Sequence, residues 1–164
     1  MAVNRVEIQR FSLVSHRPIN QVLAALDAAI GHPDMQAFSR SIATVKTSAE
    51  LEQLVAGAVG PTGLMEFARF DMGAVFRLYQ GELARPCYRL LVGNPLIMRQ
   101  MAEQVLDAAS YAPVTILIDE REDGVHLSYD RMASLLAPYR NAKATNVAQE
   151  LDAKVEKLLT EAAS

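Results

Sequence analysis

The chain has little cysteine and no long apolar run, and both absences limit the kind of protein it is. Cys87 is the single cysteine among 164 residues, so it forms no internal disulfide and suits a reducing compartment. Charged residues, Asn or Pro interrupt every apolar stretch before it is long enough to cross a bilayer. Residues 1–15 include charged side chains and lack the apolar segment of a secretory signal. We therefore expect a cytoplasmic protein without a membrane partner.

An excess of charge of one sign is also absent. The 19 acidic and 16 basic residues give a net charge of −3, which does not produce the broad positive field that binds nucleic acid. The composition is 51% hydrophobic and 21% charged, as in an ordinary globular protein, and the length suits one domain. We expect no nucleic-acid partner.

Several familiar motifs of catalysis and cofactor binding are missing. The phosphate-binding loop, the dinucleotide fingerprint and the serine nucleophile elbow do not occur in the sequence. His16, His32 and His126 lie far apart, and none belongs to a Cys/His cluster with the spacing of a zinc site. The acids of residues 119–123 are typical of a solvated hairpin turn rather than of a catalytic pair. We predict no cofactor and no metal.

Apolar periodicity in the first part of the chain predicts one strand followed by helices. The alternation changes phase around Arg10, which indicates a strand with a bulge or a change of exposed face. Thr47 and Glu50 form a capping-box pattern at the start of a helix. The predicted elements are a strand at 6–13 and helices at 18–30, 33–46 and 47–58.

The second part of the chain predicts further strands, a hairpin and closing helices. Pro113 begins an apolar strand, and an acidic turn ending at Gly124 leads into its antiparallel partner. Residues 131–164 form a C-terminal helical extension, interrupted near Pro138, of the single domain 1–164. The remaining elements are strands at 64–70 and 87–92, a short helix at 74–79 and a helix after Pro95.

A specific succession of residues marks the middle of the chain. A strand ends in Phe70 and Asp71, and Pro86 precedes the next apolar strand. That strand is followed by Gly93, Asn94 and Pro95, and the later hairpin contains Gly124 and Tyr129. Over residues 64–130 this succession resembles the family named domain of unknown function 302. Many members have histidine where this chain has Met72, and leucine where it has Ala112, so no role of a histidine there carries over.

The resemblance implies a fold rather than a reaction. It implies an α/β protein, a two-layer α/β sandwich with a mixed sheet and helices mainly on one face, and no activity common to the family. Any function must therefore be predicted from individual residues.

Two junctions between a strand and a helix offer polar groups to a ligand. Asp71 can accept a proton, bind a cation or cap the following helix, and Asn94 either caps its helix or lies at a helix N-terminus that binds an anionic ligand. Capping is the more common role of such residues. Turns after strands can meet at one end of a sheet, and a helix N-terminus supplies N–H donors. We therefore predict a site for a small anionic ligand here, with Arg77 and Tyr129 as weaker candidates for its wall.

Three functions remain open at this point. We prefer a non-catalytic small-ligand-binding or regulatory module. A thiol or sulfur-chemistry enzyme requires that Arg85 or Arg89 lower the pKa of Cys87, although a cysteine starting an apolar strand is more often a core residue. The third is a homo-oligomeric interaction protein, most simply a homodimer, in which the C-terminal helix buries an uncovered apolar face.

Overall fold

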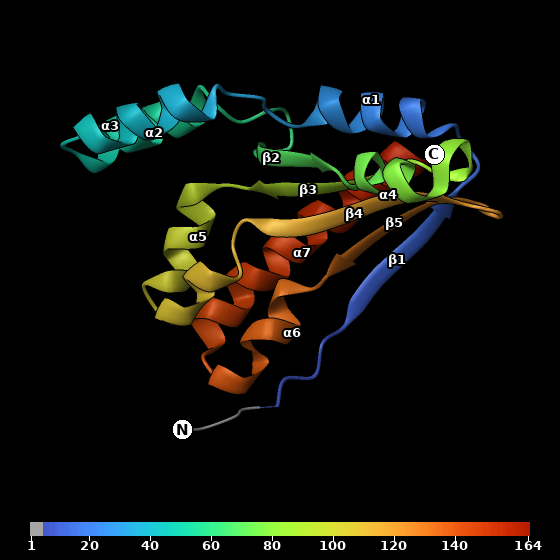
Figure 1. The fold of residues 1–164 in the computed structure, drawn as a ribbon. Coiled ribbons are helices and arrows are strands. Elements are labelled where there is room, and N and C mark those ends of the chain that lie inside the picture. Colours follow the sequence, from blue (N-terminus) through green and yellow to red (C-terminus); the bar gives the residue numbers. More distant parts are fainter. Residues whose placement is uncertain (1–4) are drawn as a thin grey trace.

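The computed structural model describes residues 5–164 and shows a five-stranded sheet with helices packed against it (Figure 1). The strands lie in the order β1-β5-β4-β3-β2, and their bounds are β1 (Arg10–Ser15), β2 (Met65–Asp71), β3 (Cys87–Gly93), β4 (Val114–Arg121) and β5 (Gly124–Asp130). The α-helices are α1 (Ile19–Ala29), α2 (Met35–Thr44), α3 (Ser48–Ala56), α4 (Met72–Gln80), α5 (Pro95–Ala102), α6 (Met132–Leu136) and α7 (Ala142–Ala163). The 3-10 helices are η1 (Gly81–Leu83), η2 (Leu106–Ser110) and η3 (Ala137–Tyr139).

The α/β class is confirmed, but all four strand pairings among residues 5–164 are antiparallel, so the mixed sheet that the resemblance implies is not found there. A parallel contact occurs there as an isolated bridge between Gly31 and Met65. A parallel pair needs a crossover that returns the chain to the opposite end of the sheet. Here Asp71 pairs with Tyr88 across α4, and Val92 pairs with Val114 across α5. Each helical connection therefore stays near the end where the preceding strand stops, and the next strand runs back beside it.

The first strand is shorter than the sequence predicts. Residues 6–9 lie outside any strand, and β1 begins at Arg10. Its register with β5 is regular, so the change of phase around Arg10 marks the start of the strand and not a bulge. The irregularity lies in β2, between Glu66 and Ala68.

Several helices begin at a residue whose short polar side chain accepts a hydrogen bond from a backbone N–H of the first turn. These capping residues are Asp34, Thr47, Asp71, Asn94 and Asn141. Within residues 5–164, no helix combines the length and the apolar character that crossing a membrane requires.

One face of the sheet is covered by helices, and Figure 1 shows α7 behind the strands. Alternate strand residues point to this covered face, where they form one core with α1, α5 and α7. The strands supply Leu90, Val92, Ile116, Ile118, Leu127 and Tyr129 to it, and α7 supplies Ala144, Ala148, Leu151, Val155, Leu158, Leu159 and Ala162. The apolar stripe of α7 is therefore buried within its own chain. It is not the uncovered face that the homodimer hypothesis assigns to the C-terminal helix.

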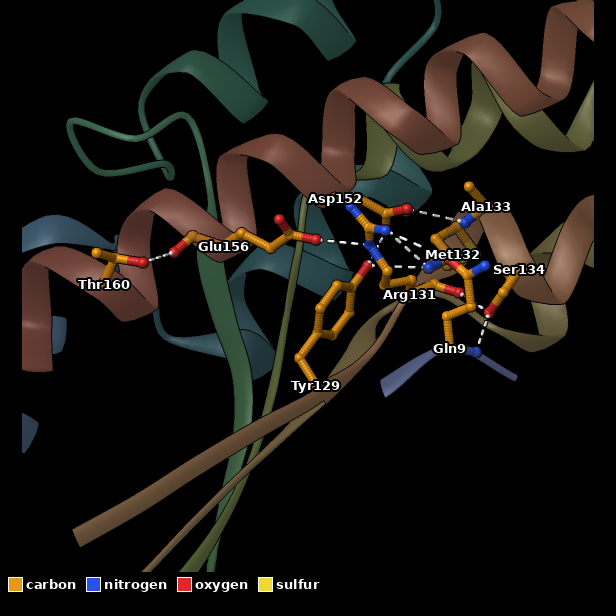
Figure 2. A network of polar contacts seen from close by, with 9 residues as sticks. All are labelled: Gln9, Tyr129, Arg131, Met132, Ala133, Ser134, Asp152, Glu156 and Thr160. Carbon is orange, nitrogen blue, oxygen red and sulfur yellow. Dashed lines mark hydrogen bonds and ion pairs between the residues drawn. The ribbon is translucent and has the colours of Figure 1, made fainter. Parts of the chain in front are cut away.

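A buried carboxylate joins the sheet to the C-terminal helices (Figure 2). Asp152 of α7 is only 3% exposed and accepts a hydrogen bond from the Tyr129 hydroxyl at 2.5 Å. It also accepts bonds from the N–H of Met132 at 2.7 Å and of Ala133 at 3.1 Å. The N-cap residue of α6, Arg131, makes no capping bond with its own side chain. Asp152 therefore caps α6 from a different helix and satisfies N–H groups that a helix start leaves unpaired.

Further polar contacts around Asp152 hold the same corner together (Figure 2). Arg131 Nε donates to Glu156 Oε1 of α7 at 2.7 Å. The Gln9 N–H donates to Ser134 Oγ at 3.1 Å, and the Ser134 hydroxyl donates to the Arg131 carbonyl at 2.7 Å. The segment before β1 and the helices α6 and α7 are thus connected through one network.

We expect Asp152→Ala to lower the free energy of unfolding by about 3 kcal/mol, because it leaves the Tyr129 hydroxyl and the Ala133 N–H without their acceptor. Asp152→Asn retains one acceptor oxygen and should lose less. Urea denaturation followed by circular dichroism measures both changes. Glu150→Ala, an exposed carboxylate of the same helix, is the control and should change stability by less than about 0.5 kcal/mol. An Asp152→Ala variant as stable as the control would contradict the assignment.

The Tyr129 contact also predicts a dependence of stability on alkaline pH. Burial, and then the negative charge of Asp152, raise the pKa of Tyr129 above its ordinary value of 10.0. The contribution of the neutral phenol to stability is therefore complete below pH 10.0 and is lost as the pH rises beyond it. We expect the melting temperature to fall more steeply above that pH in the wild type than in Tyr129→Phe. Equal slopes for the two proteins would show that Tyr129 makes no such contribution.

Candidate functional site

The structure separates the two junctions that the sequence predicts to share one ligand site. Asp71 lies opposite Tyr88 at one end of the β2–β3 pair. Gly93, which precedes Asn94, lies opposite Met65 at the other end. The length of β2 places the two junctions roughly 20 Å apart. The prediction that they meet is wrong because neighbouring antiparallel strands finish at opposite ends of a sheet.

Asp71 and Arg77 are brought together, at the start of α4. Arg77 Nη2 donates to Asp71 Oδ2 at 2.7 Å, and the Ala74 N–H donates to Asp71 Oδ1 at 2.9 Å. The hydrogen bond from Arg77 is the main cause that holds the pKa of Asp71 below its ordinary value. Both oxygens of the carboxylate have partners, so Asp71 takes the capping role.

Asn94 is likewise a helix cap. Its Oδ1 accepts from the Leu96 N–H at 2.8 Å, and its Nδ2 donates to the Gly63 carbonyl at 2.9 Å. The hollow beside it, which Phe67 and Met98 also line, has a volume of only about 80 Å³. This is room for a few water molecules at about 30 Å³ each, and is much smaller than an ordinary ligand pocket.

Tyr129 lies on the covered face of the sheet. Its side chain is 1% exposed, and its hydroxyl is bonded to Asp152. The phenol therefore belongs to the core, although Tyr129 is also one of the residues that line a trough on the open face of the sheet.

Cys87 lies at the start of β3, on the side of the sheet opposite the core. Burial, followed by the charges of Asp119 and Asp71, raises the pKa of its thiol. Asp119 is directly opposite Cys87 in β4, and His126 is directly opposite Asp119 in β5. Two strand spacings, roughly 9.6 Å, thus separate the backbones of His126 and Cys87. The imidazole is bonded through Nε2 to Asp123 at 2.7 Å, and it makes no hydrogen bond to the thiol within the described residues. The surroundings oppose formation of a thiolate.

Asp27, His32 and Glu66 form a group of potential metal ligands that sequence reasoning missed, because they are distant along the chain. One ligand atom from each lies within 4.8 Å of the others. Arg69 contacts the two carboxylates: its Nη2 donates to Asp27, and its Nε donates to Glu66 Oε2 at 3.0 Å. Because this guanidinium supplies the compensating positive charge, we interpret the group as an ion-pair cluster that joins α1 to β2.

The open face of the sheet contains a trough of about 600 Å³, a volume typical of small-molecule sites. Its floor consists of strand residues that alternate with the core residues, and its wall comes from the segment before β4 and from α6. The floor residues are Arg10, Arg89, Leu91, Thr115, Leu117, Ser128 and Asp130; the wall residues include Ser110, Tyr111, Ala112, Pro113 and Leu135. Val114 and the predicted wall residue Tyr129, both part of the core, also line the trough.

Arg89 lies on β3, at the β2 side of the trough floor, opposite Phe70 of β2 and opposite Leu117 of β4. Its guanidinium carbon is 5.9 Å from the centroid of the Phe70 ring, which is a cation–π contact. Arg10 is neutralised by Asp130 through bonds of 2.6 and 2.9 Å. In contrast, Arg89 has no carboxylate partner in the part of the chain that the structure describes.

An antiparallel five-stranded sheet with one helical layer and one open face defines the class of fold. A family model, Domain of unknown function DUF302, matches residues 40–162, and the chain therefore belongs to this family. The match confirms the resemblance and extends it in both directions beyond residues 64–130.

A solved structure, that of an uncharacterized conserved DUF302 protein from Bacillus stearothermophilus, is similar over 93% of this chain and 97% of that chain, with a TM-score of 0.64. The two sequences are 10% identical, so this likeness shows a shared fold. A comparison with curated proteins found no significant match.

We expect Cys87 to react with an apparent pKa above its ordinary value of 9.0, because burial and Asp119 disfavour the thiolate. The rate of iodoacetamide labelling of dilute native protein, measured from pH 6 to pH 11, gives this pKa. Asp119→Asn should lower it by removing the facing charge, whereas Asp123→Asn, in the turn, should leave it unchanged. An apparent pKa below 9.0 in the wild type would favour the thiol enzyme instead.

Proposed function

We propose that this protein is a non-catalytic module that binds a small anionic ligand in the trough on the open face of its sheet. The proposal depends on one observation: Arg89 offers a guanidinium without a carboxylate partner, within residues 5–164, on the floor of a hollow of about 600 Å³. A free guanidinium binds a carboxylate or phosphate through two parallel hydrogen bonds.

The surroundings of Arg89 indicate what the rest of the ligand resembles. Leu91 and Leu117 flank it on the floor and favour an apolar body. Thr115 and Ser128 add hydroxyl groups that donate or accept hydrogen bonds. Together these residues favour a carboxylate that bears a small aliphatic or aromatic group.

A binding role fits the trough better than a catalytic one. Asp130, the carboxylate on its floor, is held by two hydrogen bonds from Arg10 and is therefore not free to act as a general base. Cys87 lines a separate hollow, and its pKa is raised rather than lowered. A cytoplasmic location belongs to the same proposal, since a single cysteine suits a reducing compartment.

The proposal is tested with pairs of probes that differ only in charge: benzoate and benzamide, 2-naphthoate and 2-naphthamide, hexanoate and hexanamide. We expect at least one carboxylate to raise the melting temperature while its amide does not. A carboxylate at 100 times its Kd should stabilise the fold by about 2.7 kcal/mol. Arg89→Gln should weaken that binding by about 2 kcal/mol, or roughly 30-fold in Kd.

Arg99→Gln is the matched control, because Arg99 is an exposed arginine of α5 that pairs with Glu103 and does not line the trough. It should bind the carboxylate as the wild type does. Binding that survives Arg89→Gln would remove the proposed site. If binding is instead lost in Asp71→Asn or Asn94→Ala, while Arg89→Gln retains it, the ligand lies at a junction between strand and helix.

A further inference from the structure

The helix α4 and the 3-10 helix η1 that follows it present an apolar surface to solvent. Leu78, Tyr79 and Leu83 are 83%, 87% and 87% exposed. Val75 and Phe76 of the same helix are 50% and 41% exposed, and Val75 shares a helix face with Leu78 and Tyr79. We call these five residues the α4 patch. Monomeric soluble proteins rarely expose contiguous apolar patches of more than a few hundred Å².

The size of the α4 patch matches what a protein dimer requires. From these exposed fractions, the five side chains expose roughly 600 Å². A standard protein–protein interface buries about 800 Å² on each partner. The patch and its immediate rim therefore supply the area for one side of such an interface.

The surface beside the α4 patch is hollow, which makes the region complementary to itself. A hollow of about 360 Å³ lies between the patch and the open face of the sheet, and its lining includes Phe76, Leu83, Pro86, Cys87 and Leu117. In a two-fold symmetric dimer the same surface lies on both copies, so a projecting ridge must fit a depression of the same surface. The projecting side chains of α4 and this hollow meet that condition.

The charges around the α4 patch favour a second copy over a lipid surface. Asp119 and Glu120 line the hollow together with Arg85 and Arg121, and Arg121 Nε donates to Asp119 Oδ2 at 2.5 Å. The two acids balance the two arginines, so the lining has no excess of positive charge that would attract an anionic membrane. Arg85 Nη2 also lies 3.7 Å from Oε1 of Glu122, in the turn that follows β4. Because acids and a base are adjacent, they can pair across a two-fold axis.

We propose that the α4 patch is the interface of a two-fold symmetric homodimer, in which Leu78 and Tyr79 of each copy enter the hollow of the other. The inference is independent of the ligand in the trough. It replaces the C-terminal helix, whose apolar stripe is buried, by a surface that the chain itself leaves uncovered.

Sedimentation equilibrium of the full chain from 1 to 100 µM tests the proposal. We expect the mass to approach twice the 18.0 kDa of one chain. Leu78→Glu should raise the dimer Kd at least 100-fold, and because Leu78 is 83% exposed the monomer should keep its circular dichroism spectrum. Leu106→Glu is the matched control, since Leu106 is 79% exposed but lies on η2, outside the patch, and it should dimerise normally.

Labelling of Cys87 supplies a second measurement, because this residue lines the hollow that the dimer fills. The wild-type thiol should react more slowly at 100 µM than at 1 µM, and Leu78→Glu should remove that dependence on concentration. A wild-type mass of 18.0 kDa at 100 µM would overturn the proposal. So would a Leu78→Glu variant that dimerises as well as the wild type, or a monomer that uses Leu78 to bind phosphatidylserine vesicles.

Discussion

The architecture depends on the buried carboxylate of Asp152, at the corner where β5, α6 and α7 meet. The helix α6 has only five residues, too few to be stable alone, and the side chain of its N-cap residue makes no capping bond. Asp152 supplies the missing acceptor and at the same time binds Tyr129, which lies within the sheet. This contact holds the chain where it turns from β5 toward α7. The 22 residues of α7 can then pack along one face of the sheet.

Because α7 covers one face of the sheet, only the strand residues that point to the other face remain accessible to a ligand. In β3, Leu90 and Val92 face the core, whereas Arg89 and Leu91 face the trough. An antiparallel sheet tolerates a solvated face, so that face can hold a guanidinium and hydroxyl groups that would be costly to bury. The alternation of side chains along each strand thus explains both the apolar core and the polar groups on the trough floor.

Sequence reasoning succeeded where the determinants are local. The spacing of apolar residues predicted α1, and Thr47 was recognised as a cap from the residues beside it. The trough was missed, because the face on which Arg89 lies depends on where α7 packs. Asp152 was missed for a similar reason, since its partner Tyr129 precedes it by 23 residues and no local pattern connects them. The separation of Asp71 from Asn94 follows from strand direction, which the intervening helix does not reveal.

The two proposed surfaces meet in a short part of the chain. Phe70, the last residue but one of β2, contacts the guanidinium of Arg89 on the trough floor. The next residue, Asp71, caps α4 and so sets the direction in which that helix leaves the sheet. Leu117 lines both the trough and the hollow beside α4. A second copy bound to α4 would therefore lie next to the pair of Phe70 and Arg89. The geometry that exposes the apolar helix thus also brings it to the border of the proposed ligand site.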